Sequence, residues 1–310
     1  MIHTIQFYIN IEKNEINFLE NKYGNDILGV QNKLNNIYAS LGIAINLIVK
    51  NQYGCRILFT VDCIKLLNKS DISEYDIDNI NSKLNNFKKD IIGNEFNEEV
   101  LIRIDYRYDI ELDKIDRETL LYLYCKTFDK YKFQKKYDKF KTTIYFNSKS
   151  IQAKIYDKEC ERNNKNEAIK KYEKNILRFE VAIRNQHLNY KKRNKSIDKN
   201  LKNYLNKETY RFYMEKNLEI FLNNGDYYTI YNARKLILNS SIKNRDKEYI
   251  IDLLKYISKY GISKARDKYG KYKFKKYLKI LNELKINPIL IPKNLKGAPS
   301  FIKNPFNLCA

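Results

Sequence analysis

The segment from Arg103 to Glu111 carries residue types that could hold a metal ion. Charged residues occupy its odd positions, and apolar or aromatic residues occupy its even positions. Strict alternation predicts a β-strand with Asp105 and Asp109 on one face. Because carboxylate oxygens suit Mg²⁺ and Mn²⁺, the pattern favours a divalent-metal site. The alternative is that both acids are solvated, or form ion pairs with Arg103 and Arg107.

A second alternating segment, Leu177 to Arg184, adds another acid. Its odd positions are apolar, whereas Arg178 and Glu180 lie on the opposite face. Glu180 could complete a carboxylate site together with the two aspartates of the earlier segment. The alternative, for Glu180 as for the two aspartates, is a solvated charge or an ion pair with Arg103, Arg107 or Arg178.

A tyrosine between two lysines is the candidate nucleophile. In the segment Ile151 to Lys158, period-two geometry places Lys154, Tyr156 and Lys158 on one face. Nearby positive charge favours the phenolate, which is the form that attacks phosphorus. Most strand tyrosines are structural, however, and the chain contains 27 tyrosines.

Several further elements must position these residues. Strands are predicted over residues 1–11 and 57–61, and helices over 72–91 and 116–132. Residues 143–146 and 151–158 flank a turn-forming Asn-Ser-Lys-Ser sequence, which predicts a β-hairpin. The result is an α+β fold, whose largely antiparallel sheet of four or five strands has one apolar face and one charged face.

The sequence changes character near residue 223. An Asn-Asn-Gly-Asp stretch at 223–226 predicts a boundary between a first domain, 1–222, and a small helical domain, 223–310. Three helices are expected in the second domain, followed by an extended proline-containing tail of about 25 residues. They form either a helix-turn-helix-like DNA-binding module or a bundle that packs on the core. The helices span 246–259, 263–269 and 271–284, and the last one carries Lys271, Lys273, Lys275 and Lys276.

Composition restricts the function. A net charge of +22 over 310 residues predicts a polyanionic partner, although a lysine- and tyrosine-rich composition is also typical of an AT-rich genome. Five cysteines without metal-binding spacing favour reduced thiols in the cytoplasm. No apolar run is long enough for a membrane helix, and no signal peptide is evident. The two histidines form no metal motif, and the missing phosphate-binding loop argues against ATP hydrolysis.

Three motifs in order carry a family resemblance: Arg103-Ile104-Asp105, Tyr156-x-Lys158-x-x-Glu161 and Leu177-Arg178-Phe179-Glu180. The chain resembles the gene II/gene X replication initiators of filamentous phages and, more distantly, the Rep_trans initiators of rolling-circle plasmids. The resemblance covers residues 95–190 and continues into 250–291. It implies a rolling-circle initiator that nicks one strand of a supercoiled replicon, stays attached through a tyrosine to the 5′ phosphate, and later rejoins the strand.

The resemblance also implies residue roles and partners. Tyr156 matches the nucleophile, Lys158 the motif lysine, and Asp105 and Glu180 the motif acids. Glu161 matches a family position without an assigned role. Glu161 and Lys154 are both expected to contact the catalytic side chains without touching the substrate. Asp109 departs from the family pattern. The implied cofactor is Mg²⁺ or Mn²⁺. The expected partners are double- and single-stranded origin DNA and the host helicase and polymerase, in the cytoplasm of a bacterial host, with no membrane involved. The predicted DNA contacts are Arg103, Arg107, Arg178, Lys271, Lys273, Lys275 and Lys276.

Two other functions remain open from the sequence. A conjugative relaxase would use the same chemistry but would pass the strand to a transfer apparatus. A non-catalytic regulator would bind duplex DNA through the 246–284 helices and would show no metal-dependent nicking.

Overall fold

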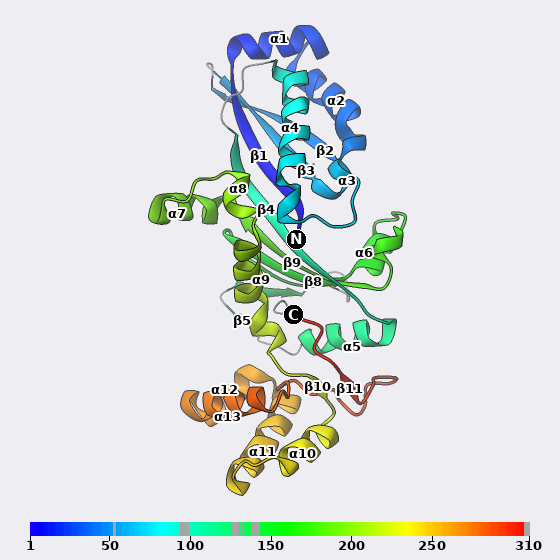
Figure 1. Ribbon diagram of the computed structural model, residues 1–310, viewed down its shortest axis with the longest axis vertical. Coiled ribbons are helices and arrows are strands. Elements are labelled where there is room, and N and C mark those ends of the chain that lie inside the picture. The colour runs from blue at the N-terminus through cyan, green and yellow to red at the C-terminus, as the bar shows by residue number, and fades with distance from the viewer. Residues whose placement is uncertain (52–53, 94–98, 126–129, 132, 138–142, 307–310) are drawn as a thin grey trace. The chain divides into compact units, whose positions relative to one another are not determined.

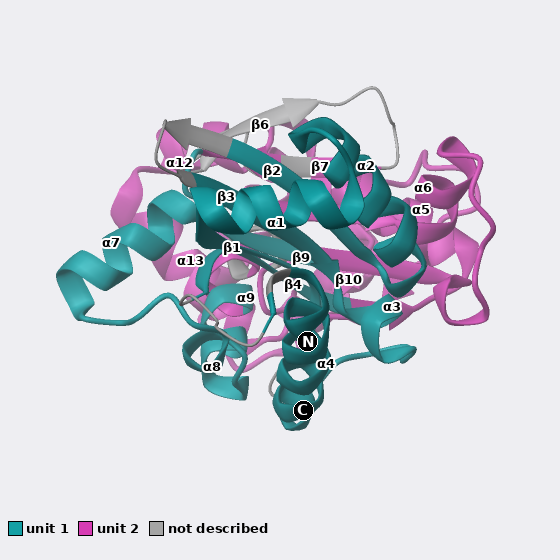
Figure 2. Cartoon of the chain, turned by 90° about the horizontal axis from the view of Figure 1, so that it is seen from above, with its two compact units in different colours: residues 1–108, 149–152, 180–214 teal, residues 109–148, 153–179, 215–310 magenta. Residues whose placement is uncertain are grey.

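The computed structural model describes most of the chain in two compact units (Figures 1 and 2). The described residues are 1–51, 54–93, 99–125, 130–131, 133–137 and 143–306. Unit 1 comprises residues 1–108, 149–152 and 180–214, and unit 2 comprises residues 109–148, 153–179 and 215–310. Helices combined with antiparallel strands confirm the predicted α+β class. The predicted domain boundary at residue 222 stays a prediction.

The sheet of unit 1 has its strands in the order β2-β3-β1-β4-β9. Its pairings β1–β3, β2–β3 and β1–β4 are antiparallel. Two of the strands, β4 and β9, also contribute residues to unit 2. The strands are β1 (Ile2–Glu12), β2 (Ile43–Asn51), β3 (Gly54–Asp62), β4 (Val100–Glu111) and β9 (Ile176–Arg184).

Alternation along these strands separates an apolar face from a polar face. Ile5 of β1 pairs with Val61 of β3 and with Ile104 of β4, and all three are buried. One residue earlier, Thr4 pairs with Asp62 of β3 and Asp105 of β4. The polar side chains therefore share one face of the sheet, as the sequence pattern predicts.

Helices cover the apolar face of the unit 1 sheet. Tyr38 of α2 and Phe87 of α4 meet edge to face, and Phe87 packs in the same way on Phe59 of β3. Asp26 caps α2 by accepting a hydrogen bond from the Gly29 N–H, which satisfies a free donor in the first turn. The helices are α1 (Lys13–Tyr23), α2 (Ile27–Tyr38), α3 (Cys63–Leu67), α4 (Ile77–Ile92), α7 (Asn185–Lys195), α8 (Leu201–Tyr204) and α9 (Lys207–Leu222, shared with unit 2), with short 3-10 turns at Ala39–Leu41 and Glu74–Asp76.

The strands that contribute to unit 2 follow the order β4-β9-β8-β7-β6-β5. The neighbouring β7 and β8 confirm the predicted hairpin. The predicted helix 116–132 is wrong at its end, because α5 ends at Cys125 and Lys130–Tyr131 form a strand. The elements are α5 (Lys114–Cys125), β5 (Lys130–Tyr131), β6 (Phe133–Tyr137), β7 (Thr143–Asn147), β8 (Ile151–Asp157), α6 (Lys158–Asn164) and a 3-10 turn at Lys171–Glu173.

The three predicted carboxy-terminal helices are confirmed, with a fourth helix before them. Single glycines, Gly261 and Gly270, separate the last three helices, and both have positive φ angles. The predicted tail is extended but packed, since Ile289, Ile291 and Ile302 are buried. The elements are β10 (Tyr227–Tyr228), α10 (Ile230–Asn239), α11 (Asn244–Tyr260), α12 (Ile262–Tyr269), α13 (Lys271–Glu283) and β11 (Phe301–Ile302).

The Asn223–Asp226 stretch is a junction of three chain segments. The Asp226 N–H donates to the Lys285 carbonyl at 2.9 Å, and the Asn287 N–H donates to the Asp226 carbonyl at 2.8 Å. The Asn304 N–H donates to Asp226 Oδ1 at 2.8 Å. Backbone and side-chain hydrogen bonds therefore fix this stretch against the segments that follow α13 and β11.

Gly225→Ala is expected to destabilise unit 2 by about 2 kcal/mol, as overpacking of a tight contact does. A Cβ at position 225 would lie 2.2 Å from the backbone carbon of Ile286, so the two segments would have to separate. Urea unfolding of the variant would measure the loss. Gly93→Ala is a useful comparison, because no atom lies within 4 Å of its added Cβ, although its positive φ carries a strain of its own. An unchanged unfolding midpoint in Gly225→Ala would contradict the expectation.

Among the residues described, every helix is too short or too polar to cross a lipid bilayer. Cys55 and Cys63 are buried free thiols, and Cys125 and Cys160 are partly exposed free thiols. Cys309 lies outside the described residues.

Candidate active site

Two of the predicted motif acids lie close to one arginine in unit 1. Asp105 of β4 accepts two hydrogen bonds from Arg103, through Nε and Nη2, each at 2.7 Å. Residues two apart on a strand share a face, which explains the contact. Asp105 and Glu180 are each only 6 % exposed. The structure therefore holds both carboxylates in a largely buried, polar environment.

Asp105 and Glu180 both affect the pKa of Arg103. Burial lowers the pKa of this guanidinium, but the hydrogen bonds to Asp105 and the negative charges of Asp105 and Glu180 outweigh burial and raise the pKa above its usual value. Arg184, on β9, has its pKa lowered by burial and by the positive charge of Arg103. Two acids and two arginines thus form one electrostatic cluster within unit 1.

Bulges in the sheet border this cluster. The β1–β4 register shifts between Ile2 and Thr4, so that His3 is an additional residue opposite the Asp105–Tyr106 pair of β4. A second shift, between Gln6 and Phe7, lies opposite the Leu101–Arg103 segment. Bulges bend a strand and change the direction of side chains, and they are frequent near active sites. They set the positions of Arg103 and Asp105 relative to the neighbouring strand.

The two carboxylates are suitable donors for Mg²⁺ or Mn²⁺. Magnesium is often held by only one or two carboxylates, together with waters and substrate phosphates. Within the described residues, no group of three His, Cys, Asp or Glu side chains could hold a metal by itself. Asp105 and Glu180 therefore fit a site that substrate oxygens complete. The Arg103 guanidinium would have to release Asp105 when a metal binds.

Asp109, the third predicted metal ligand, is bound to an arginine in unit 2. Its Oδ1 and Oδ2 accept from Arg178 Nε and Nη2, both at 2.7 Å. Arg178 is fully buried, whereas the Asp109 side chain is 21 % exposed. Asp109 therefore has a structural role as the counter-ion of a buried arginine. Its role as a metal ligand stays a prediction.

Tyr156 lies near the end of β8 and is 6 % exposed. The strand ends at Asp157, so Lys158 is already the first residue of α6 and does not follow strand periodicity. The Lys158 ammonium nevertheless lies 5.9 Å from the centre of the Tyr156 ring. Lys154, which does share the strand with Tyr156, is half-buried. Positive charge is therefore present beside the candidate nucleophile.

A buried arginine fixes the turn that follows Tyr156. Asp157 caps α6 by accepting from the Cys160 N–H at 3.0 Å, and its other oxygen accepts from Arg117 at 2.8 Å. Arg117 also donates to Glu159 at 2.6 Å and to the Asn175 side chain at 3.0 Å. These bonds tie the strand–helix junction to α5 and to the residue before β9.

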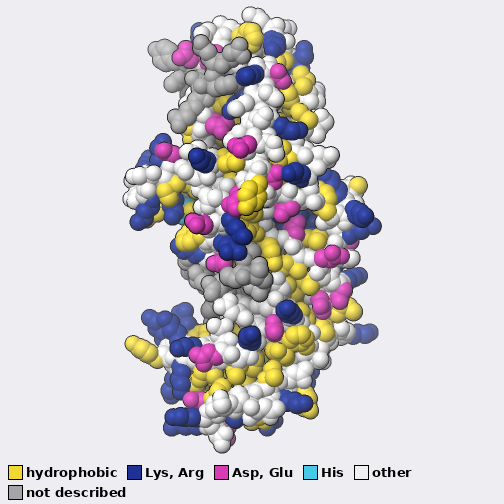
Figure 3. Space-filling view, in the orientation of Figure 1, with side chains coloured by type: hydrophobic (Ala, Val, Ile, Leu, Met, Phe, Trp, Pro, Cys, Tyr) yellow, Lys and Arg dark blue, Asp and Glu magenta, His cyan; other side chains and the backbone are white. Residues whose placement is uncertain are grey.

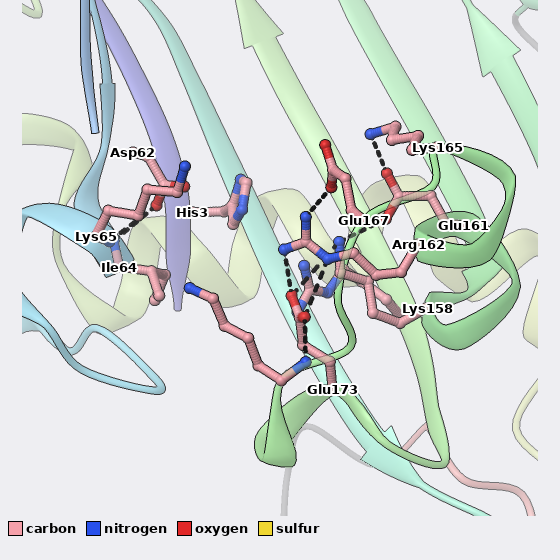
Figure 4. Close-up of polar contacts among 12 residues, drawn as sticks. His3, Asp62, Ile64, Lys65, Lys158, Glu161, Arg162, Lys165, Glu167 and Glu173 are labelled. Carbon is pink, nitrogen blue, oxygen red and sulfur yellow. Dashed lines mark hydrogen bonds and ion pairs between the residues drawn. The ribbon is translucent and has the colours of Figure 1, made fainter. Parts of the chain in front are cut away.

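Two glutamates hold Lys158 in unit 2 (Figure 4). The Lys158 ammonium donates to Glu161 at 2.5 Å and lies 3.7 Å from Glu173. Glu173, which is 1 % exposed, also accepts two hydrogen bonds from Arg162, at 2.5 and 3.0 Å. Lys158 itself is 3 % exposed. Glu161, whose role the sequence left open, is thus the direct partner of the motif lysine.

Burial and charge act in opposite directions on these groups. Burial lowers the pKa of Lys158, and the positive charge of Arg178 lowers it further against the effect of Glu161. Burial raises the pKa of Glu173, but hydrogen bonds from Arg162 and the Lys170 N–H outweigh burial and leave that pKa below its usual value. The glutamate is consequently ionised near neutral pH.

Glu173→Gln is expected to lower stability by about 2 kcal/mol at neutral pH, because a charge-assisted hydrogen-bond network is weakened. A carboxyl whose pKa is depressed on folding stabilises the fold above its unfolded value, here 4.5, and loses this contribution as the pH falls through the folded pKa. Denaturant unfolding at several pH values should therefore show that the free energy of unfolding falls less steeply on acidification in the variant than in the unaltered protein. Glu167→Gln, which alters a more exposed partner of Arg162, is the matched control. Parallel pH curves for Glu173→Gln and the unaltered protein would contradict the expectation.

The other predicted DNA contacts occupy different environments. Arg107 is 3 % exposed in unit 1, where it donates to the Ser70 carbonyl and lies 3.4 Å from Asp71. Arg178 is enclosed with Asp109, as described above. In the carboxy-terminal helices, Lys276 donates to both oxygens of Asp246, at 2.8 and 3.0 Å. Lys271, Lys273 and Lys275 are exposed.

Sequence reasoning missed Glu173, Arg162 and Arg117. Arg162 lies 11 positions from Glu173, and Arg117 lies 40, 42 and 58 positions from its three side-chain partners, so no local spacing indicates these contacts. A signal did exist for Asp157, because an aspartate at the end of a strand and just before a helix is a preferred cap. Glu173 lies in a charged stretch whose local sequence gives no comparable signal.

The fold and these side chains define an α+β protein with a tyrosine–lysine–glutamate group in one unit and a carboxylate–arginine group in the other. Residues 72–204 match the family model of the amino-terminal part of a phage replication-associated protein, the gene II protein. The matched range includes all three motifs from Arg103 to Glu180. This match supports a place in a phage replication initiator family and a role in the initiation of phage DNA replication. No curated protein matches the chain.

Proposed function

We propose that the protein initiates rolling-circle replication by nicking one strand of origin DNA and later rejoining it. The observation that carries the proposal is the family match over residues 72–204, which includes the Tyr156-to-Glu161 motif. The environment of Tyr156, with a buried lysine held beside its ring, supports a tyrosine nucleophile. A net charge of +22 agrees with a DNA substrate. The further resemblance to Rep_trans initiators stays a prediction.

In the proposed reaction the Tyr156 phenolate oxygen attacks phosphorus and the bond to the 3′ oxygen breaks. The phenol has lost its proton to a base, and the departing 3′ oxygen takes up a proton to become a hydroxyl. The protein is left as a phosphotyrosine ester on the 5′ phosphate. Attack by a 3′ hydroxyl on this ester reverses the bond changes, so rejoining requires no ATP.

Lys158 is assigned to charge stabilisation. Its ammonium is held at a fixed position by Glu161 and Glu173, and positive charge near the ring favours the phenolate. The same charge stabilises the negative oxygens that develop around phosphorus. Glu161 acts through the lysine and is therefore a positioning residue.

Asp105 and Glu180 are assigned to holding Mg²⁺ or Mn²⁺. When bound, such an ion polarises phosphate oxygens and neutralises part of their charge. The two acids contribute the oxygen ligands, and Arg103, which is hydrogen-bonded to Asp105 and lies near the charge of Glu180, offsets part of their negative charge. We expect the partners to be double- and single-stranded origin DNA, with the host helicase and polymerase acting afterwards in the bacterial cytoplasm.

The test is to incubate the protein with supercoiled DNA carrying its cognate origin, with and without Mg²⁺. The expected products are open circles with covalently attached protein, formed only with the metal, and mass spectrometry should locate the ester on Tyr156. A conjugative relaxase would give the same adduct, and neighbouring transfer genes would distinguish it. Tight duplex binding without any nicking would overturn the proposal in favour of a regulator.

A further inference from the structure

Among the helices of unit 2, α12 and α13 carry the largest excess of positive charge. Residues 262–283 contain eight Lys and Arg against two Asp and Glu. Figure 3 shows Lys and Arg side chains gathered over α12 and α13, at the lower left of the view. The sequence pattern places apolar Phe274, Tyr277 and Leu281 on the buried side of α13, so the charges face outward.

Ion pairing divides these cations into two groups. Lys276 is bound to Asp246 of α11, and Lys279 lies 4.0 Å from Glu283. For the other six, the described residues supply no carboxylate within ion-pair distance, and one of these, Lys268, lies over the Tyr256 ring. The remaining five, which we call the basic face, are Lys264, Arg266, Lys271, Lys273 and Lys275.

Tyrosines of these helices are mostly engaged with one another. Tyr249 stacks on Tyr277 with ring centres 6.0 Å apart, and Tyr256 contacts both Tyr260 and Tyr269. Lys268 covers the Tyr256 ring at 4.1 Å. Surfaces that bind single strands present open rings on which bases stack. Here the rings pack together, which argues against a stacking platform.

Tyr272 is the exception, because its side chain is 91 % exposed. It lies between Lys271 and Lys273 in the first turn of α13. One almost fully open ring beside lysines suits contact with a sugar–phosphate backbone rather than the stacking of successive bases. Unpaired cations on two consecutive short helices are the arrangement expected for a duplex backbone.

We propose that the basic face and Tyr272 bind the phosphate backbone of duplex DNA, whereas Lys276 serves to hold α13 against α11. The inference rests on the proposed function only for the choice of DNA as the polyanion. It adds which surface binds the duplex, and it excludes Lys276, alone of the four neighbouring lysines at the start of α13, from DNA contact. Binding at this surface requires neither Tyr156 nor a metal ion.

The test compares full-length variants for binding to a random-sequence duplex without divalent metal, over a range of salt concentrations. Lys271→Gln/Lys275→Gln should weaken duplex binding about tenfold and reduce the slope of log affinity against log salt by about 1.8. Lys276→Gln should change the affinity less than about twofold, since its ammonium is already paired. Lys33→Gln/Lys83→Gln removes the same charge from exposed helix positions in unit 1 and is the matched control.

Two further measurements decide the outcome. A single strand of equal length should lose less affinity than the duplex in Lys271→Gln/Lys275→Gln, and Tyr272→Ala should also weaken duplex binding. Equal losses in the Lys33→Gln/Lys83→Gln control, an unchanged salt slope, or a larger loss for the single strand would each overturn the inference. Because no nicking is measured, failure here is distinct from failure of the proposed reaction.

Discussion

The Tyr156→Phe variant is expected to form no covalent adduct with origin DNA and to nick it about a thousandfold or more slowly. The substitution removes only the phenolic oxygen that the proposal makes the nucleophile. Since the ring is 6 % exposed and its shape is kept, the free energy of unfolding should fall by only about 1 kcal/mol. Gel analysis of nicked circles after protein denaturation measures nicking and adduct together.

Tyr172→Phe is the control for Tyr156→Phe. Tyr172 also lies in unit 2, in the turn that carries Glu173, and is partly exposed. It should retain the adduct and the nicking rate. A Tyr156→Phe protein that still becomes attached to DNA would assign the nucleophile to another residue, and the position of the ester would then identify it.

Asp109→Ala is expected to destabilise the protein by about 3 kcal/mol. Removing this carboxylate leaves the Arg178 guanidinium, which is fully buried, without the acid that accepts its two 2.7 Å hydrogen bonds. A buried charge that loses its counter-ion costs more than the pair contributed. Denaturant unfolding of the full chain measures the change.

Replacing both members of the pair tests this reasoning. Asp109→Leu/Arg178→Met removes two charges together and should cost less than Asp109→Ala alone, because no buried charge is left uncompensated. Asp252→Ala, on the exposed side of α11, should cost less than about 0.5 kcal/mol. If Asp109→Ala leaves the unfolding midpoint unchanged, the pair does not act as a buried ion pair.

Local periodicity was sufficient to predict the strands that carry the candidate site. Alternation in β4 and β9 correctly placed Asp105 and Glu180 on the polar face, where both lie near Arg103. The three carboxy-terminal helices could be predicted because Gly261 and Gly270 end the first two and apolar residues recur at helical spacing in all three. These signals lie within a few positions of one another in the sequence.

Contacts between distant positions could not be predicted in this way. Charge alternation left open whether Asp109 binds a metal or an arginine, and the structure shows the ion pair with Arg178. Arg107, one of the predicted DNA contacts, is 3 % exposed and donates to the Ser70 carbonyl, a contact that local alternation does not indicate. Strand periodicity also failed at Lys158, because the capping of α6 by Asp157 ends the strand one residue earlier. Tertiary packing determined each of these outcomes.

The single-glycine junctions in the carboxy-terminal helices have an evolutionary consequence. Each inserted residue would turn the following helix by roughly 100° about its axis. One insertion beside Gly270 would therefore direct Phe274 outward and rotate the α13 lysines of the basic face away from its α12 residues. This region can accept many substitutions on its surface but few changes in length. Related chains should accordingly keep the spacing from Gly261 to Gly270 even where their lysines differ.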